Sequence, residues 1–74
     1  MYRVVAIKRD GKAQTWEPVT GVFTDNPMPT ANISKKNKAT EEFKKSLDKV
    51  NADDYARVQL SEKDKDGVWR NEGG

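Results

Sequence analysis

The 74-residue chain contains no cysteine and no histidine. Without cysteine, disulfides and thiolate metal sites are excluded, and a reducing cytoplasm is the expected location. Without histidine, the chain lacks the side chain best suited to proton transfer near neutral pH, and its three serines have no histidine to activate them. These absences predict a protein that is not an enzyme and that carries no cofactor and no catalytic or metal site.

Long apolar runs are also absent, and only 34% of the residues are hydrophobic. No stretch approaches the roughly 20 residues that a membrane-spanning helix needs, and residues 1–5 lack the start of a signal peptide. A chain this short forms one domain with a net stability of only ~3–5 kcal/mol. We therefore expect a soluble protein without membrane contact, folded over residues 1–70 and ending in a flexible tail over 71–74.

The first β-hairpin is predicted at the N-terminus. Residues 2–8 are rich in β-branched and aromatic side chains, which is typical of a strand. The Asp-Gly pair at 10–11 favours a two-residue type I′ turn. That turn places Val5 opposite Trp16, a favourable cross-strand pair. It also sets two cations opposite each other beside the turn, so a longer loop stays open as an alternative.

A broken strand and a long loop follow. Because Pro18 cannot donate a hydrogen bond to a neighbouring strand, we expect a strand over 13–17 and its continuation over 19–24. Residues 25–37 contain two prolines and predict a loop, with Ile33 anchoring its middle to the core. Loops of this length in small domains are often functional.

A helix and a second hairpin complete the chain. The helix is predicted over 38–50, where apolar residues recur at helical spacing. These residues are Ala39, Phe43, Leu47 and Val50. A strand over 55–62 and a short strand over 68–70 are joined by a charged turn that contains the second Asp-Gly pair.

The predicted fold class is therefore α+β, a small ββαββ domain with a mainly antiparallel four-stranded sheet and one helix packed on one face. One helix covers only one face of the sheet. We expect Tyr2, Val4 and Ala6 on the other face, which is left open. Small domains seldom leave an apolar patch bare without a use for it, so this face and the proline-rich loop are where we look for function.

The first functional hypothesis is a non-catalytic protein-binding module. We expect a small regulator or inhibitor of a host protein, of the kind that phages and mobile elements encode, and this source rests on the frequency of such proteins and not on a motif. Partner binding is predicted for nine residues that combine aromatic, apolar and basic side chains. They are Tyr2, Val4, Arg9, Trp16, Met28, Lys35, Lys36, Trp69 and Arg70.

Two alternatives remain open. Residues 1–40 carry seven basic and three acidic side chains, against seven and nine in residues 41–74, which favours a polarised surface. A basic rim with exposed aromatics would suit single-stranded nucleic acid, although the helix lysines alternate with acids at ion-pair spacing. A homodimer is the other alternative.

Trp16 and Trp69 also suit the core, because a chain with only two leucines needs the apolar area that the two indole rings would bury.

Overall fold

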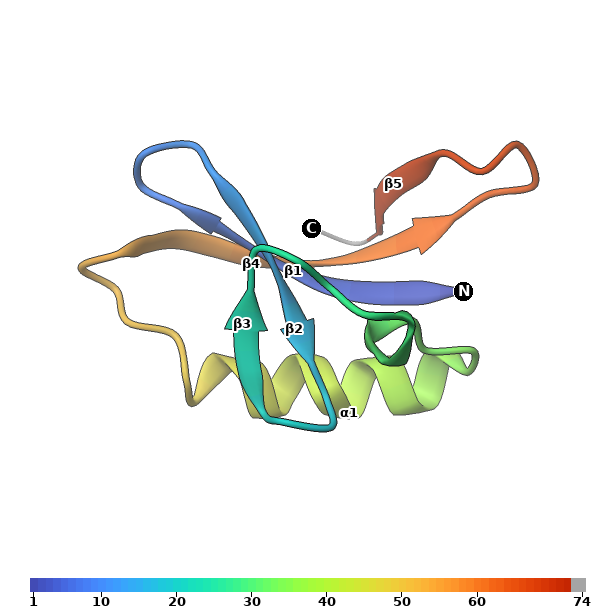
Figure 1. Ribbon diagram of the computed structural model, residues 1–74, viewed down its shortest axis with the longest axis horizontal. Coiled ribbons are helices and arrows are strands. Elements are labelled where there is room, and N and C mark those ends of the chain that lie inside the picture. Colours follow the sequence, from blue (N-terminus) through green and yellow to red (C-terminus); the bar gives the residue numbers. More distant parts are fainter. Residues whose placement is uncertain (73–74) are drawn as a thin grey trace.

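A single twisted sheet forms the body of the protein, and one α-helix lies across one of its faces (Figure 1). The computed structural model describes residues 1–72. The elements in chain order are β1 (Tyr2–Lys8), β2 (Ala13–Glu17), β3 (Val22–Thr24), the 3-10 helix η1 (Pro29–Ala31), α1 (Lys36–Leu47), β4 (Tyr55–Lys63) and β5 (Trp69–Glu72). The strands are antiparallel, in the order β3-β2-β1-β4-β5. The α+β class is confirmed, but the sheet has five strands and not four, and the order is βββαββ.

The additional strand arises because residues 18–21 form a turn where we expected only a break. The Gly21 N–H donates to the Glu17 carbonyl at 2.7 Å, and Gly21 takes a φ of +70°, which glycine adopts without strain. The chain therefore reverses, and β3 pairs with β2 instead of continuing it. Trp16 lies opposite Phe23 in this pair.

The first hairpin has the longer loop of the two considered. Residues 9–12 lie between β1 and β2, and the Lys8 N–H donates to the Lys12 carbonyl at 2.8 Å, so the loop itself is residues 9–11, with Gly11 at a φ of +91°. The register of β2 against β1 is shifted by one residue from the register that a two-residue turn gives, so Val5 lies opposite Thr15 and not opposite Trp16. Because alternate side chains of a strand point to opposite faces, this shift puts Trp16 on the same face as Val4.

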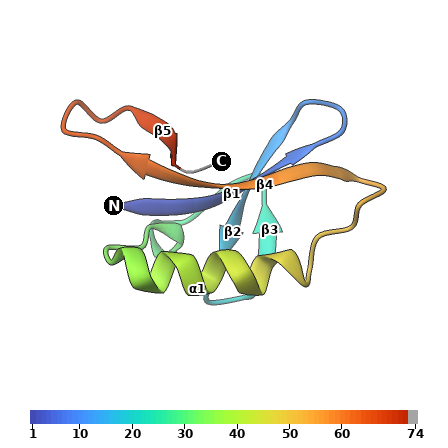
Figure 2. The ribbon, with the colours of Figure 1, turned by 180° about the vertical axis from the view of Figure 1, so that it is seen from behind.

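That shared face is the core. Val4, Ala6 and Trp16 are all buried, and α1 packs on this side against β1 and β4. Figure 2 shows the same arrangement from behind, with α1 beneath the sheet. The expectation that Val4 and Ala6 lie on the open face is therefore wrong. The β1 residues on the opposite face are Val5 and Ile7, which are half-buried.

The helix presents a different stripe to the sheet from the one predicted. Its buried residues are Ala39, Glu42 and Ser46, whereas Leu47 is 48% exposed. Ser46 satisfies its hydroxyl by donating to the Phe43 carbonyl at 2.6 Å, and its small side chain allows α1 to approach the sheet. Within residues 1–72, no helix is long and apolar enough to cross a membrane.

The second hairpin runs further than predicted. β4 pairs with β1 as well as with β5. Asn71 and Glu72, which we expected in a flexible tail, pair with Ser61 and Leu60 as part of β5. The rest of that predicted tail, residues 73–74, lies outside the described residues.

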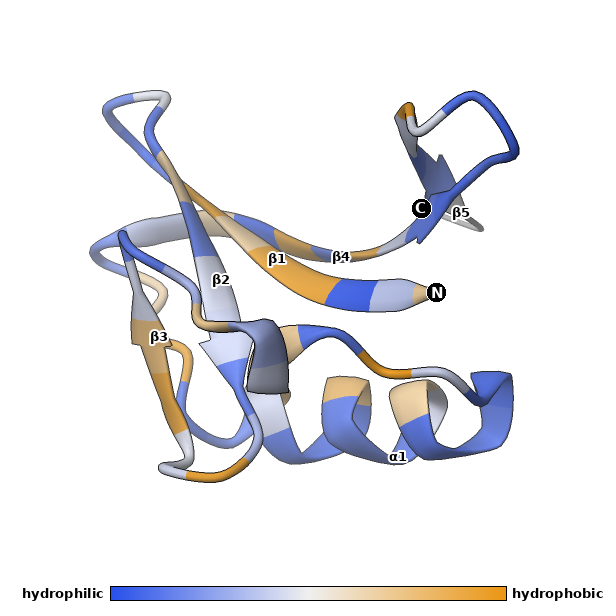
Figure 3. Ribbon diagram, turned by 45° about the vertical axis from the view of Figure 1, so that its right-hand side comes forward, coloured by the Kyte–Doolittle hydropathy of each residue, from blue (hydrophilic) through white to orange (hydrophobic). Residues whose placement is uncertain are grey.

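The loop over 25–35 crosses part of the face opposite α1. Its short helix η1 contacts β2 and lies in front of that strand in Figure 3. Ile33 anchors the loop as predicted, because it is buried and exchanges two backbone hydrogen bonds with Tyr2, at 2.7 and 2.8 Å. On this side Thr15 and Glu17 of β2 are also buried. The remainder of the face lies between the two hairpins, which rise away from α1 (Figure 1).

Candidate functional site

The nine residues predicted to contact a partner do not form one surface. Val4 and Trp16 are buried on the helix side of the sheet. Their side chains are not available to a partner in this fold, and we remove them from the candidate surface. The physical reason has two parts: the one-residue change in the pairing of β1 with β2 puts Trp16 on the same face as Val4, and α1 packs on that face.

Trp69 and Arg70 lie on β5, whereas Tyr2 lies on β1, which β4 separates from β5. The Arg3 guanidinium lies over the Trp69 ring, 4.8 Å from its centre, and Tyr2 is half-buried on β1. Arg70 donates from Nε to the Asp64 carboxylate at 2.8 Å, and this hydrogen bond holds the pKa of Asp64 below its ordinary value. Both arginines are therefore engaged within the protein.

The other predicted residues lie apart from β5 and from one another. Arg9, in the loop of the first hairpin, donates from Nε to the Ala52 carbonyl at 2.8 Å. Lys35 and Lys36 are exposed at the start of α1. Met28 lies in the proline-rich loop and is 65% exposed.

Met28 belongs to a group of exposed apolar side chains where β2 turns into β3. Val19, in the turn, is 74% exposed, and Val22, on β3, is 53% exposed. Met28 and Val22 line the same pocket, of about 190 Å³. β3 is an edge strand that, within the described part of the chain, pairs only with β2. We call residues 17–28 the hairpin-end surface.

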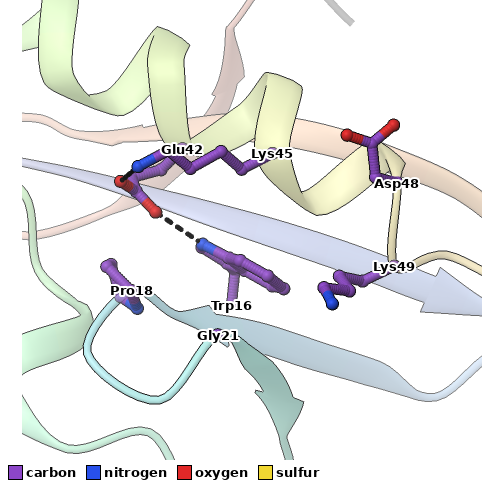
Figure 4. A pocket seen from close by; sticks show the side chains of 7 residues that line it. All are labelled: Trp16, Pro18, Gly21, Glu42, Lys45, Asp48 and Lys49. Atoms are coloured by element: carbon purple, nitrogen blue, oxygen red, sulfur yellow. Dashed lines mark hydrogen bonds and ion pairs between the residues drawn. The ribbon is translucent and has the colours of Figure 1, made fainter.

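A larger pocket, of about 380 Å³, lies on the helix side of the same turn. Its lining comes from β2, from the turn, from the second half of α1 and from the two residues after that helix, and consists of Trp16, Pro18, Gly21, Glu42, Lys45, Asp48 and Lys49. Figure 4 shows the Trp16 ring between the turn and the helix, with its Nε1 directed at Glu42. The hairpin-end surface thus contains the smaller pocket, and its residues Pro18 and Gly21 also line the larger one.

Glu42 in the larger pocket is fully engaged by neighbouring donors. Its Oε1 accepts the Trp16 indole N–H at 3.0 Å, and its Oε2 pairs with the ammonium groups of Lys38 and Lys45, each at 3.3 Å. Burial alone would raise the pKa of Glu42, but the hydrogen bonds from Trp16, Lys45 and Lys38 lower it below 4.5. This carboxylate therefore stabilises the fold, and three donors within the protein already hold it.

The lowered pKa of Glu42 makes a pH-dependent contribution to stability. A carboxyl group with a lowered folded-state pKa stabilises the protein fully above its unfolded value and loses that effect as pH falls through the folded-state value. We expect the free energy of unfolding of Glu42→Gln to lie below that of the wild type at neutral pH. The gap should narrow once pH falls below 4.5. Urea denaturation from about pH 7 to about pH 3 measures it, and a gap that stays constant would contradict the assignment.

The second buried glutamate, Glu17, is not fully engaged. Its Oε1 accepts the Val19 N–H at 3.3 Å, while its buried Oε2 has no hydrogen-bond partner among the described residues. Glu17 lines the smaller pocket, together with Thr20, Val22, Thr24, Asn26 and Met28. The sequence does not indicate a role for Glu17, because residues 19–24 are predicted to continue the strand. A continuous strand would not form this pocket, which needs the chain to reverse between β2 and β3.

Within residues 1–72 there is no group of three or more acidic side chains that could hold a metal ion. The candidate site is therefore defined by exposed apolar residues, an edge strand and one incompletely satisfied carboxylate. Comparison of the chain with protein-family models, with the curated proteins and with the solved structures finds no match.

Proposed function

We propose that the protein is a non-catalytic protein-binding module and that its partner docks on the hairpin-end surface. The observation that carries this proposal is the exposure of three apolar side chains: Val22 on the edge strand β3, Met28, which lines the same pocket as Val22, and Val19 in the turn that precedes β3. An edge strand offers backbone donors and acceptors to an extended segment of another protein. Apolar side chains beside that edge add buried area when the segment binds.

The biological role that we propose is that of a small regulator or inhibitor of a host protein, of the kind that phages and mobile elements encode. A domain with so small a core acts by occupying a surface of a larger protein and not by housing a substrate. The same proposal places the protein in the cytoplasm, because a chain without cysteine needs no oxidising compartment.

Single-stranded nucleic acid is the alternative partner. It would require basic side chains that are free to reach phosphates, beside aromatic rings that are free to stack. Three of the four arginines, Arg3, Arg9 and Arg70, already contact an aromatic ring, a carbonyl oxygen and a carboxylate within the protein. The apolar character of the hairpin-end surface further favours a protein partner.

Val22→Lys is expected to abolish partner binding while leaving the fold intact. The substitution places a charge on the edge strand, which opposes pairing with another strand. Because Val22 is half-exposed, we expect the stability to change by only about 0.5 kcal/mol. The tagged wild type should recover a stoichiometric protein from native host cells at moderate salt, and Val22→Lys should recover at least about tenfold less of it.

Val68→Lys is the matched control. Val68 is 50% exposed and lies between β4 and β5, away from the hairpin-end surface. This variant should therefore recover the partner as well as the wild type does. Equal loss with both variants, or no stoichiometric protein with the wild type, would contradict the proposal. A gel shift of DNA or RNA at low salt that disappears steeply as salt rises would support the alternative. The mass of the free protein in solution would reveal a homodimer.

A further inference from the structure

We propose that the smaller pocket receives the lysine or arginine side chain of an extended segment of the partner protein, with Glu17 as the carboxylate that binds it. This inference rests on the proposed function, and it specifies the chemistry of the partner. It follows from the burial of Glu17, from the lining of the pocket and from the geometry of the free edge of β3.

Glu17 lacks the donors that a buried carboxylate needs. Its residue surface is only 6% exposed, yet a single backbone N–H at 3.3 Å is its only hydrogen-bond donor among the described residues. Glu42, buried to a similar extent, has three donors. Buried charged groups in proteins are nearly always paired. The contrast indicates that a donor for Glu17 comes from outside the described part of the chain.

The other residues that line this pocket suit a long cationic side chain. Val22 and Met28 provide apolar surface for an aliphatic stem, and a carboxylate is the preferred partner of an ammonium or guanidinium head. Apart from Glu17, the lining carries no charge. Met28 is exposed, and its unbranched side chain adapts easily, so this part of the wall can adjust to admit the head group.

The sheet geometry sets the length of the side chain. Glu17 lies opposite Val22, and Thr15 opposite Thr24, so these side chains share the outer face. A strand added to β3 would point every second side chain to that face, over the pocket. The added strand would lie two strand spacings, about 10 Å, from β2. A lysine or arginine covers this distance together with the Glu17 side chain and the hydrogen bond that joins them, whereas a short polar side chain falls short.

A small-molecule probe tests the pocket without any knowledge of the partner. We would titrate the 15N-labelled protein with N-acetyl-arginine methylamide and follow the backbone amides by NMR. The expected result is a saturable shift of Val22, Thr24 and Met28 amides within ~50 mM probe, the range of a single weak site. The neutral analogue N-acetyl-citrulline methylamide has nearly the same shape and should bind at least about tenfold more weakly.

Glu17→Gln keeps the shape of the side chain and removes its charge, so it should erase the difference between the two probes. Equal binding of arginine and citrulline by the wild type overturns the proposal, and this comparison needs no variant to fold. An absence of shifts at the pocket, or an undiminished arginine preference in Glu17→Gln, overturns it as well.

The failure of this inference can be distinguished from the failure of the proposed function. If Val22→Lys loses the captured partner and Glu17→Gln retains it, the hairpin-end surface is the binding site but the cation is not recognised by Glu17. If both variants lose the partner while Val68→Lys retains it, both statements are supported. If both retain it, both are wrong.

Discussion

Trp16→Ala is expected to abolish cooperative folding at 25 °C. The substitution removes a buried indole that packs edge-on against Phe23, with ring centres 5.1 Å apart, and it leaves the buried Glu42 carboxylate without its indole donor. Truncating a buried tryptophan costs about 3–5 kcal/mol, which is as large as the ~3–5 kcal/mol that a domain of this size has in total. Far-UV circular dichroism and urea titration should show no folded baseline.

Trp69→Ala is the matched control. Trp69 is only half-buried, and its ring makes a cation–π contact with the Arg3 guanidinium. An exposed cation–π contact is worth about 0.5–1 kcal/mol, so this variant should still unfold cooperatively at a slightly lower urea concentration. If Trp69→Ala proved as destabilising as Trp16→Ala, the description of the core would be wrong.

The sequence treats the two tryptophans alike, and only the strand pairing separates them. Each follows an Asp-Gly turn on the returning strand of a hairpin. A three-residue loop in place of the two-residue turn moves Trp16 to the helix face and leaves Val5 on the other. Loop length depends on small energy differences within the turn, so the sequence predicts that a hairpin exists more reliably than it predicts its register.

The elements with strong local patterns were predicted well. The strands over 2–8 and 55–62 and the existence of the helix follow from β-branched content and helical spacing. In the structure β1 has the predicted bounds, β4 ends one residue later, and the ends of α1 differ by two and three residues. The reversal that makes β3 a separate strand was missed because Pro18 and Gly21, three positions apart, favour a bend and a turn equally. Only the pairing of β3 with β2 distinguishes the two.

The candidate site depends on this missed strand, which explains why little of it was foreseen. Met28 was predicted and lies on the hairpin-end surface. Val19, Val22 and Glu17 acquire their significance only when the chain reverses at residues 18–21. Glu42 was not foreseen either, because a glutamate among lysines on a helix is typical of a solvated face. Its role depends on the hydrogen bond from the Trp16 indole, which only the fold brings close.

Glu42→Ala is expected to destabilise the protein by about 2–3 kcal/mol, because hydrogen bonds to a charged group contribute about 1.5–3 kcal/mol and a buried donor left alone is costly. The alanine leaves the Trp16 indole N–H without an acceptor and releases Lys38 and Lys45. Because the expected loss is more than half of a ~3–5 kcal/mol total, the urea midpoint at neutral pH should fall sharply.

Glu41→Ala is the control for this measurement. Glu41 precedes Glu42 in the same helix but is exposed, and its truncation should change stability by no more than about 0.5 kcal/mol. A double-mutant cycle with Trp16→Phe then isolates the buried contact. If the indole N–H and the carboxylate stabilise each other, the double variant should lose at least about 0.5 kcal/mol less than the two single variants together. If the two losses are strictly additive, the hydrogen bond between Trp16 and Glu42 does not stabilise the packing of α1 on the sheet. The contribution of Glu42 to stability would then come only from its ion pairs with Lys38 and Lys45.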